Sequence, residues 1–318
     1  MDRSSTPQNR IDLIDAFVDY LRYERNYSAR TQQAYREALL QYADFVSGAD
    51  APFGPTQIAL GSVRAWMADM SQRGRKVSSV KRNLSALRSF CKYLRRQGLL
   101  DSNPLLHLAS PRVPRPLPVW VTDEQMSLAL DGPEWNNDDF TDVRDRLILH
   151  ILYQTGLRRA ELLALRDGDV DLGRSELRVL GKGNKERIVP FGPELNGMLR
   201  HYIEVRRRDV AATVPWPRLL VGLKGEALSS GRVYNIVRAR LQVIPQLAKR
   251  SPHVLRHSFA TGMLRQDADL MAVKEIMGHA SLDSTEVYTH LSPQELLKNY
   301  NQAHPRAASS ITPKKKGD

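Results

Sequence analysis

A proline-rich stretch divides the chain of 318 residues near the end of its first third. Residues 110–121 read S-P-R-V-P-R-P-L-P-V-W-V and contain four prolines. Because proline lacks a backbone N–H and fixes φ, this stretch can form neither a helix nor a central strand, and it is typical of a semi-rigid linker. The sequence therefore predicts two domains, residues 1–109 and 122–303, each long enough to bury a core.

The domain before the linker is predicted to be helical, because its apolar residues recur at helical spacing. Helices are expected at about 11–26, 28–46, 61–73 and 79–97, the second capped by Ser28 and the last two ended by Gly74 and Gly98. The buried stripe of the second helix is expected to contain Tyr35, Leu39, Tyr42 and either Phe45 or Val46. The stripe of the fourth consists of Val80, Leu84, Leu87, Cys91 and Leu94, so Cys91 is expected to fill space in the core.

Positive charge concentrates in this first domain. The whole chain has 47 Lys and Arg against 35 Asp and Glu, a net charge of +12. Residues 64–115 contain twelve basic and two acidic residues, a net of +10. This excess favours a polyanion, either nucleic acid or an acidic membrane surface. One basic helix face, without interleaved Glu, is expected to contact DNA phosphates through Lys81, Arg82, Arg88, Lys92 and Arg95, although a merely solvated face is the alternative.

The domain after the linker is predicted to be mainly α with a small β-hairpin, an α+β fold. A capping box of Thr122 and Gln125 opens it. Helices are expected at about 123–130, 140–155, 159–166, 193–211, 229–241, 252–265, 269–277 and 293–301. Two short strands at about 175–180 and 186–191 are joined by the turn G-K-G-N, which indicates a hairpin. Residues 304–318 are expected to form a disordered basic tail.

Several classes of protein are excluded by what the sequence lacks. No apolar run approaches the roughly 18 residues of a membrane span, and the polar N-terminus does not resemble a signal peptide. The single cysteine cannot form an internal disulfide, which fits a reducing cytoplasm. The sequence has no zinc-ligand spacing, no P-loop and no acidic cluster suited to two metals. We therefore expect a cytoplasmic protein without a cofactor or a metal.

The stretch from 251 to 291 contains the residues most suggestive of chemistry. Ser251 is expected to cap a helix whose first turn contains Pro252. His253 and Arg256 are three residues apart, so they share one face of that helix. Because a helix N-terminus attracts anions, these two side chains predict an anion site. His279 follows a glycine, and Tyr288 lies in a polar segment before the last helix, which suggests phosphate chemistry with a tyrosine nucleophile.

Two upstream residues complete this set. Arg158 lies in T-G-L-R-R-A-E-L, where one helix ends and the next begins, and Lys182 lies at the tip of the predicted hairpin. The full set, in chain order, is Arg158, Lys182, His253, Arg256, His279 and Tyr288. With the motifs T-G-L-R, G-K-G-N-K-E-R, H-V-L-R-H-S-F-A-T, G-H and V-Y-T-H, the chain resembles the tyrosine recombinase (phage integrase) family, and most closely the bacterial Xer recombinases. The resemblance covers nearly the whole chain.

The resemblance implies a role for each residue of the set. Arg158 and Arg256 would clamp the non-bridging oxygens of a DNA phosphate, and Tyr288 would attack it to form a 3′-phosphotyrosyl link. Lys182 would protonate the leaving 5′-oxygen and His253 would act as a base, while His279 would donate a hydrogen bond to the phosphate. Taken singly, each residue has a simpler explanation in packing, turn or capping chemistry, and Glu161 could simply pair with Arg158. The agreement of six positions in order and spacing favours catalysis.

Two departures from the family pattern concern helix packing only. Gly262 replaces a second histidine after F-A-T, and Arg159-Ala160 replaces an apolar-Ser pair. The implied function is site-specific recombination that resolves chromosome or plasmid dimers. An integrase of a mobile element is the alternative, although only about ten residues precede the first helix and an arm-binding domain is not expected. A non-catalytic DNA-binding regulator is a further alternative, which the retention of all six residues disfavours. A type IB topoisomerase is disfavoured by the short chain and the Xer-like flanks.

The resemblance also implies an assembly on double-stranded DNA. Four subunits would act on two DNA sites, either as copies of one chain or together with a paralogous recombinase. The last helix would dock on a neighbouring subunit. Ser292 and Glu295 form its capping box, and its apolar face consists of Leu296, Leu297 and Tyr300. The alternative is that this helix packs on its own domain.

Overall fold

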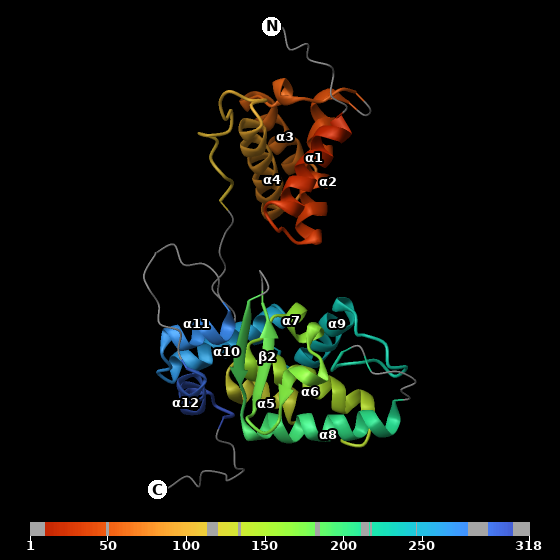
Figure 1. Cartoon of the computed structure of the whole chain (residues 1–318), viewed down its shortest axis with the longest axis vertical. Helices are drawn as coiled ribbons and strands as arrows, with labels where there is room; N and C mark the ends of the chain where they lie inside the picture. Colours follow the sequence, from red (N-terminus) through yellow and green to blue (C-terminus); the bar gives the residue numbers. More distant parts are fainter. Residues whose placement is uncertain are drawn as a thin grey trace. The chain divides into compact units, whose positions relative to one another are not determined.

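The computed structural model describes residues 10–48, 51–112, 120–132, 135–181, 185–210, 216, 218–245, 247–278 and 292–307. The chain forms two compact units, residues 1–116 and 117–318 (Figure 1). Of the proline-rich linker, residues 113–119 lie outside the described residues, and 110–112 form neither helix nor strand. No helix among the described residues is long and apolar enough to cross a membrane.

The first unit contains the four predicted helices: α1 (Arg10–Tyr23), α2 (Ala29–Ser47), α3 (Leu60–Gln72) and α4 (Val77–Arg96), with a short 3-10 turn, η1 (Pro55–Gln57), before α3. Local chemistry fixes their ends. The Ser28 side chain accepts a hydrogen bond from the backbone N–H of Thr31 at 3.3 Å, which caps α2 as predicted. Gly74 and Gly98 follow α3 and α4 with φ of +71°, a conformation that favours glycine.

An aromatic core holds these helices together. Phe17 of α1 and Phe90 of α4 lie with ring centroids 5.2 Å apart, and both are fully buried. The predicted stripe of α4 is buried along its whole length, Cys91 included, so Cys91 fills the core as expected. Burial raises the pKa of its thiol to about 12. The sequence left Phe45 and Val46 as alternatives for the buried stripe of α2. Val46 is partly buried and packs against the core, whereas Phe45 is 38% exposed.

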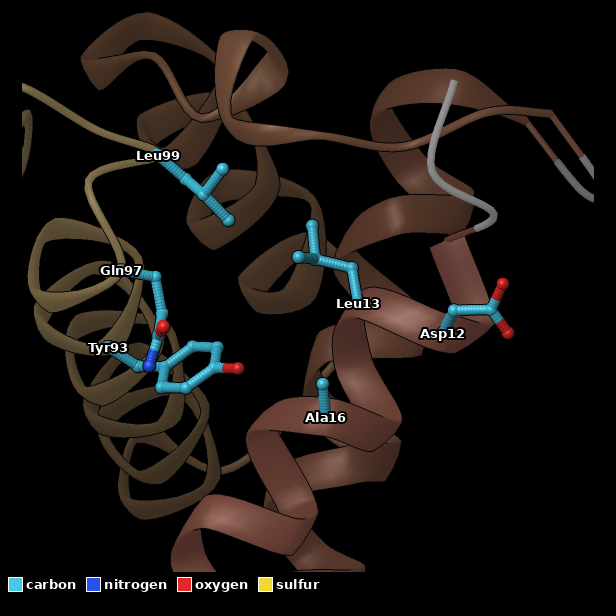
Figure 2. Close-up of a pocket in the computed structure, with 6 residues that line it drawn as sticks. All are labelled: Asp12, Leu13, Ala16, Tyr93, Gln97 and Leu99. Atoms are coloured by element: carbon cyan, nitrogen blue, oxygen red, sulfur yellow. The ribbon is translucent and has the colours of Figure 1, made fainter. Parts of the chain in front are cut away.

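A cavity of about 310 Å³ lies between α1 and the end of α4 (Figure 2). Asp12, Leu13 and Ala16 line it from α1, and Tyr93, Gln97 and Leu99 line it from α4 and the turn after it. None of these residues belongs to the set predicted to contact DNA. The cavity therefore gives no support to the predicted phosphate-binding surface.

The second unit contains the eight predicted helices and one sheet: α5 (Asp123–Leu130), α6 (Phe140–Thr155), α7 (Arg159–Ala164), α8 (Pro193–Asp209), α9 (Ser230–Arg240), α10 (Pro252–Arg265), α11 (Leu270–Met277) and α12 (Pro293–Ala303), with β1 (Val170–Asp171), β2 (Glu176–Leu180) and β3 (Glu186–Pro190). Two further 3-10 turns, η2 (Asp167–Asp169) and η3 (Leu241–Val243), precede β1 and follow α9. The strands pair antiparallel in the order β1-β2-β3, with Leu177 opposite Val189. β1 was not predicted, because two residues are too few to show an alternating pattern. Thr122 and Gln125 form the predicted capping box.

Helix α6 is the centre of this unit. Thirteen of its sixteen residues are buried, and it packs against α8 and α10. Its C-terminal end leads directly into the T-G-L-R motif. The motif therefore begins from a rigid, buried element, which is what a precisely placed side chain requires.

Helix α12 packs on its own unit, beside α10, α11 and β3 (Figure 1). Leu296 and Tyr300 are buried, and the predicted capping box is present, because Ser292 and Glu295 each accept a hydrogen bond from the other's backbone N–H. The single chain thus adopts the arrangement that the sequence left as an alternative to docking on a neighbour.

The prediction of a disordered tail from residue 304 is wrong for its first four residues. His304 and Arg306 are buried, and the Arg306 guanidinium donates hydrogen bonds to Asp131 at 2.6 Å and Glu194 at 3.0 Å. It also lies 3.3 Å from Asp123 of α5. These carboxylates are 112 to 183 residues away in sequence, so no local pattern could reveal the contact. Residues 308–318 lie outside the described part.

Candidate active site

The T-G-L-R motif makes a tight turn between α6 and α7. Gly156 has φ of +62°, and a Cβ at this position would lie 2.4 Å from Cδ1 of Phe259 on α10. Any other residue would therefore be strained and would displace the buried ring of Phe259. Two residues later the chain enters α7, and Arg158 occupies its N-cap position. The close approach of α10 at Gly156 places the turn beside the helix that contains His253 and Arg256.

Arg158 is held by one carboxylate and one backbone carbonyl. Its guanidinium donates from Nη1 to Oε1 of Glu161 at 2.8 Å and from Nη2 to the carbonyl oxygen of Gly278 at 2.9 Å. The second carboxylate oxygen of Glu161 accepts from the backbone N–H of Arg158 at 2.8 Å. Glu161 is 6% exposed, while the Arg158 side chain is 37% exposed. The pairing with Glu161 that the sequence offered as a simple explanation is thus real, yet it leaves Arg158 accessible.

Arg256 lies on α10, and among the described residues its guanidinium donates hydrogen bonds to backbone carbonyls. It is buried, and it donates from Nη1 to the carbonyl of Gly156 at 2.5 Å and from Nη2 to the carbonyl of Met277 at 2.7 Å. His253, one turn earlier, is exposed. Ser251 occupies the N-cap position, but its buried hydroxyl has no hydrogen-bond partner among the described residues, so the expected side-chain cap is absent. Pro252 begins the helix as predicted.

The charges of these residues shift one another's pKa. Burial, followed by the positive charge of Arg158, lowers the pKa of the Arg256 guanidinium to about 10, so Arg256 stays charged at neutral pH. His253 is exposed, yet the partial desolvation of its ring, followed by the positive charges of Lys249 and Arg256, lowers its pKa, which favours the neutral form that a base requires. Burial alone would raise the pKa of Glu161, but hydrogen bonds from Arg187 and Arg158 outweigh it and keep the carboxyl ionised.

Sequence reasoning missed one residue of this cluster, Arg187 on β3. Its guanidinium forms a bidentate ion pair with Glu161, from Nη1 to Oε1 at 3.1 Å and from Nη2 to Oε2 at 2.8 Å. Its Nε donates to the carbonyl of Ile276 at 2.7 Å. The available signal was the motif G-K-G-N-K-E-R, of which Arg187 is the last residue.

Three successive carbonyls at the end of α11 therefore accept hydrogen bonds from three different arginines. Ile276 accepts from Arg187, Met277 from Arg256 and Gly278 from Arg158. The last carbonyls of a helix have no partner within the helix and carry a partial negative charge, so guanidinium groups bind them well. This arrangement places Arg158 and Arg256 near the exposed His253, whose pKa both of them lower. The two guanidinium groups can bind an anion such as a phosphate.

Three of the six predicted residues, Lys182, His279 and Tyr288, lie outside the described residues. Residues 182–184 and 279–291 contain them, and only the residues that flank these two segments are described. The N–H of Gly181 donates to the carbonyl of Lys185 at 2.8 Å, which closes the β2–β3 ladder on either side of 182–184. Gly278, directly before His279, ends α11 in the left-handed region with φ of +63°. Gly262 lies in α10, where an added Cβ would meet no atom within 4 Å.

The five residues predicted to contact DNA lie on α4 and differ in their surroundings. Lys81, Arg82, Lys92 and Arg95 are exposed, and no carboxylate of the described residues forms an ion pair with them. Arg88 is only half-exposed, and its guanidinium donates to the Ser110 hydroxyl at 2.6 Å and to the carbonyl of Leu108. Arg88 therefore fastens residues 108–110, where the linker begins, onto α4.

One cluster in the second unit has the composition of a metal site. Asp131, His150 and Glu194 each offer one ligand atom, and these atoms lie within 4.8 Å of one another. Both carboxylates, however, already pair with the Arg306 guanidinium. A cation would have to compete with that buried positive charge, so this donor set does not fit a metal ion.

Comparisons with known proteins agree on the family. The model of the phage integrase family matches residues 120–295, and that of the phage integrase N-terminal SAM-like domain matches residues 14–98. A tyrosine recombinase XerC of Chlorobaculum parvum is 35% identical, over 96% of this chain and 99% of the relative. Another XerC, of Pelotomaculum thermopropionicum, is 37% identical, over 92% of this chain and 98% of its own.

Solved structures share the fold. XerH site-specific recombinase bound to its difH substrate, in a pre-cleavage complex, is 22% identical with a TM-score of 0.64, covering 92% of this chain and 88% of that one. A lambda integrase dimer bound to a COC′ core site is 18% identical with a TM-score of 0.61, covering 87% and 99%. The family model covers more than half of the chain, and relatives above 30% identity cover nearly all of it. The chain therefore belongs to the phage integrase family and is a tyrosine recombinase.

Proposed function

We propose that the chain cuts and rejoins DNA at specific sites through a 3′-phosphotyrosyl intermediate. The observation that carries this proposal is the pair Arg158 and Arg256, both held on the backbone carbonyls at the end of α11. A phosphodiester is an anion that resists nucleophiles, and its transition state carries additional negative charge. Preorganised guanidinium groups stabilise that charge without having to rearrange during the reaction.

The proposed reaction uses the remaining predicted residues in the roles that the family resemblance gives them. The Tyr288 oxygen attacks the phosphorus, a P–O bond to tyrosine forms, and the bond from phosphorus to the 5′-oxygen breaks. His253, neutral because its pKa is lowered, accepts the tyrosine proton. Lys182 donates a proton to the 5′-oxygen, and His279 donates a hydrogen bond to the phosphate. The reversal of these steps with another 5′-hydroxyl rejoins the strand, so the bond energy is conserved without ATP.

The decisive experiment traps the covalent intermediate. On a nicked suicide DNA substrate, the wild type should form a protein–DNA adduct that survives a denaturing gel. Tyr288→Phe should bind DNA normally and form no adduct, because the nucleophilic oxygen is gone. Arg256→Ala should bind DNA and cleave at least about 100-fold more slowly, which is the usual cost of losing one oxyanion contact. An adduct with Tyr288→Phe, or an adduct that disappears on adding EDTA, would refute the mechanism.

We also propose that residues 1–109 bind the DNA backbone, and that the linker lets residues 122–303 contact the same duplex. Lys81, Lys92 and Arg95 supply exposed positive charge on α4 and form no ion pair with any carboxylate of the described residues. Changing these three to Ala should weaken binding and reduce the slope of log K against log salt by roughly one per lost contact. Lys224→Ala, an exposed change in the second unit, is the control. An unchanged slope in the triple variant would remove α4 from the interface.

The biological role that we propose is resolution of chromosome or plasmid dimers in the cytoplasm, by four subunits on two DNA sites. The XerC relatives favour this role, since the chain matches them over almost their whole length. Integration of a mobile element is the second candidate. Selection of binding sites from random DNA would separate the two: a site within the host chromosome's own sequence supports dimer resolution, and a site at the ends of an element supports integration.

A further inference from the structure

We propose that Arg187 is a positioning residue for cleavage, which keeps Arg158 oriented toward the scissile phosphate. The proposal rests on the recombinase function proposed above. Arg187 lies on β3 opposite Val179, two residues after Lys185, where the chain returns from the hairpin tip. Its side chain is 10% exposed, and all three of its guanidinium nitrogens donate to protein atoms. It therefore acts on the other residues of the site and makes no contact with the substrate itself.

The contacts of Arg187 coincide with both anchors of Arg158. Arg158 is held by Glu161 and by the carbonyl of Gly278. Arg187 holds the same carboxylate through both of its oxygens, and it holds α11 through Ile276, two residues before Gly278. Loss of Arg187 would leave the Glu161 carboxylate held by Arg158 itself and by no second arginine, and the last turn of α11 would lose one of its three donors. Arg158 would then lose its fixed direction.

Only an arginine can make this set of contacts. The planar guanidinium has a fork that matches a carboxylate, with Nε left over for a third acceptor, whereas a lysine ammonium is a single point of charge on a flexible stem. Gly278 adds a second restriction: a Cβ there would lie 3.0–3.2 Å from Nη1, Cζ and Nε of Arg187. The backbone at Gly278, directly after α11, therefore approaches the Arg187 guanidinium so closely that little room is left for a side chain.

The contacts of Arg256 are separate from those of Arg187. Arg256 is held by the carbonyls of Gly156 and Met277, and neither of these accepts a hydrogen bond from Arg187. The carboxylate that Arg187 binds is thus an anchor of Arg158 and not of Arg256. An Arg187 variant should bind DNA as the wild type does, and its Arg256 should keep its hydrogen bonds to Gly156 and Met277. It should nevertheless stabilise the charge of the transition state less well.

The test compares two DNA substrates that differ in charge at the scissile position. One carries the normal phosphodiester, and the other carries a neutral methylphosphonate, in which a methyl group replaces one charged oxygen. Because the neutral centre needs less cationic stabilisation, a loosened clamp should slow its cleavage much less. A change that merely damages the fold should slow both substrates by the same factor. Adduct formation is measured in single turnover at saturating DNA.

Arg187→Lys keeps the charge but removes the fork. We expect it to bind DNA with unchanged affinity and to cleave the phosphodiester about 100-fold more slowly, the scale of a misplaced catalytic group. On the methylphosphonate the loss should shrink to less than about 10-fold, as it should for Arg158→Ala. Arg174→Lys is the matched control, since Arg174 is 78% exposed beside β2 and lies outside the site. It should cleave both substrates like the wild type.

Each other outcome has a defined meaning. Equal losses on the two substrates, or wild-type cleavage of the phosphodiester by Arg187→Lys, would overturn the positioning role. An Arg187→Lys protein that fails to fold, judged by thermal unfolding, would assign Arg187 to stability and also overturn it. If the wild type forms no adduct with either substrate, the proposed function itself fails. That result is distinguishable, because it does not depend on residue 187.

Discussion

Acidification should destabilise the second unit through two buried histidines. His150 of α6 and His304 after α12 are both fully enclosed, and burial is the main reason why the pKa of each lies at about 3. The charges around His150 also act on it: Arg306 and Arg146 lower its pKa further, and Asp131 raises it. Arg306 lowers the pKa of His304 as well.

The sign and size of the effect follow from proton linkage. An unfolded histidine has a pKa near 6.5, so below that pH the unfolded state binds more protons than the folded state, and stability falls as pH falls from about 6.5 toward 3. At pH 5.0 each histidine costs about 2 kcal/mol, which is roughly 1.5 pH units at about 1.4 kcal/mol per unit. Glu194 opposes this trend, because burial raises its pKa and the folded state then takes up a proton more readily. We therefore expect a net loss of roughly 2–4 kcal/mol between pH 7.5 and pH 5.0.

Urea unfolding at pH 7.5, 6.5 and 5.0 measures this loss. Tryptophan fluorescence in a Trp66→Phe background follows the second unit alone, since the other three tryptophans follow residue 116. A double variant, His150→Gln with His304→Phe, should remove most of the pH dependence. The phenyl ring preserves the stacking of residue 304 on Tyr300, whose ring centroid lies 5.0 Å away. His107→Gln, an exposed change in the first unit, is the control. A wild type equally stable at pH 7.5 and 5.0, or a double variant as sensitive as the wild type, would refute the reasoning.

Three further perturbations have clear expected results. Arg306→Ala should lower the free energy of unfolding by about 2–4 kcal/mol in urea titration, somewhat below the 3–5 of fully buried pairs, because its carboxylate partners are 25–40% exposed. Gly278→Ala should cost about 1–2 kcal/mol for the left-handed backbone alone, and it should also slow adduct formation, because its Cβ would meet the Arg187 guanidinium. Cys91 should resist alkylation by iodoacetamide at pH 8 in the folded protein, because its thiol is buried with a pKa of about 12, and it should react in urea.

Most of the fold could be predicted because its signals are local. Twelve helices were expected at bounds close to those found, since apolar spacing and capping residues act within a few neighbours. The capping boxes at Thr122 and Ser292 are examples, and both are present. Ser251 shows the limit of such reasoning: the residue type and position suit a cap, but its hydroxyl is buried and turned to no acceptor or donor of the described chain.

The contacts that the sequence did not reveal are those between distant residues. Arg306 meets carboxylates of α5, of the loop after it, and of α8, so a segment expected to be disordered is buried. Arg88 fits a basic stripe by spacing, yet its guanidinium binds Leu108 and Ser110, where the linker begins. In both cases the sequence shows that the residue is an arginine and therefore positively charged. It does not show which residue the arginine binds, because that partner is brought near by the fold and not by the spacing along the chain.

The same limit applies to the arginine cluster, and its net charge explains the arrangement. Arg158, Arg187 and Arg256 bring three positive charges to the end of α11, where Glu161 is the carboxylate to which Arg158 and Arg187 are bonded. The other hydrogen bonds that these guanidiniums donate within the described residues go to backbone carbonyls, which cancel no charge. The cluster therefore keeps a net charge of about +2, which matches the roughly two negative charges on the non-bridging oxygens in the transition state of phosphodiester attack. A second carboxylate would hold the guanidiniums equally well but would reduce that charge. Anchoring on the helix terminus provides both rigidity and charge, and this is why a neutral substrate should separate the arginines that supply charge from the residues that only support the fold.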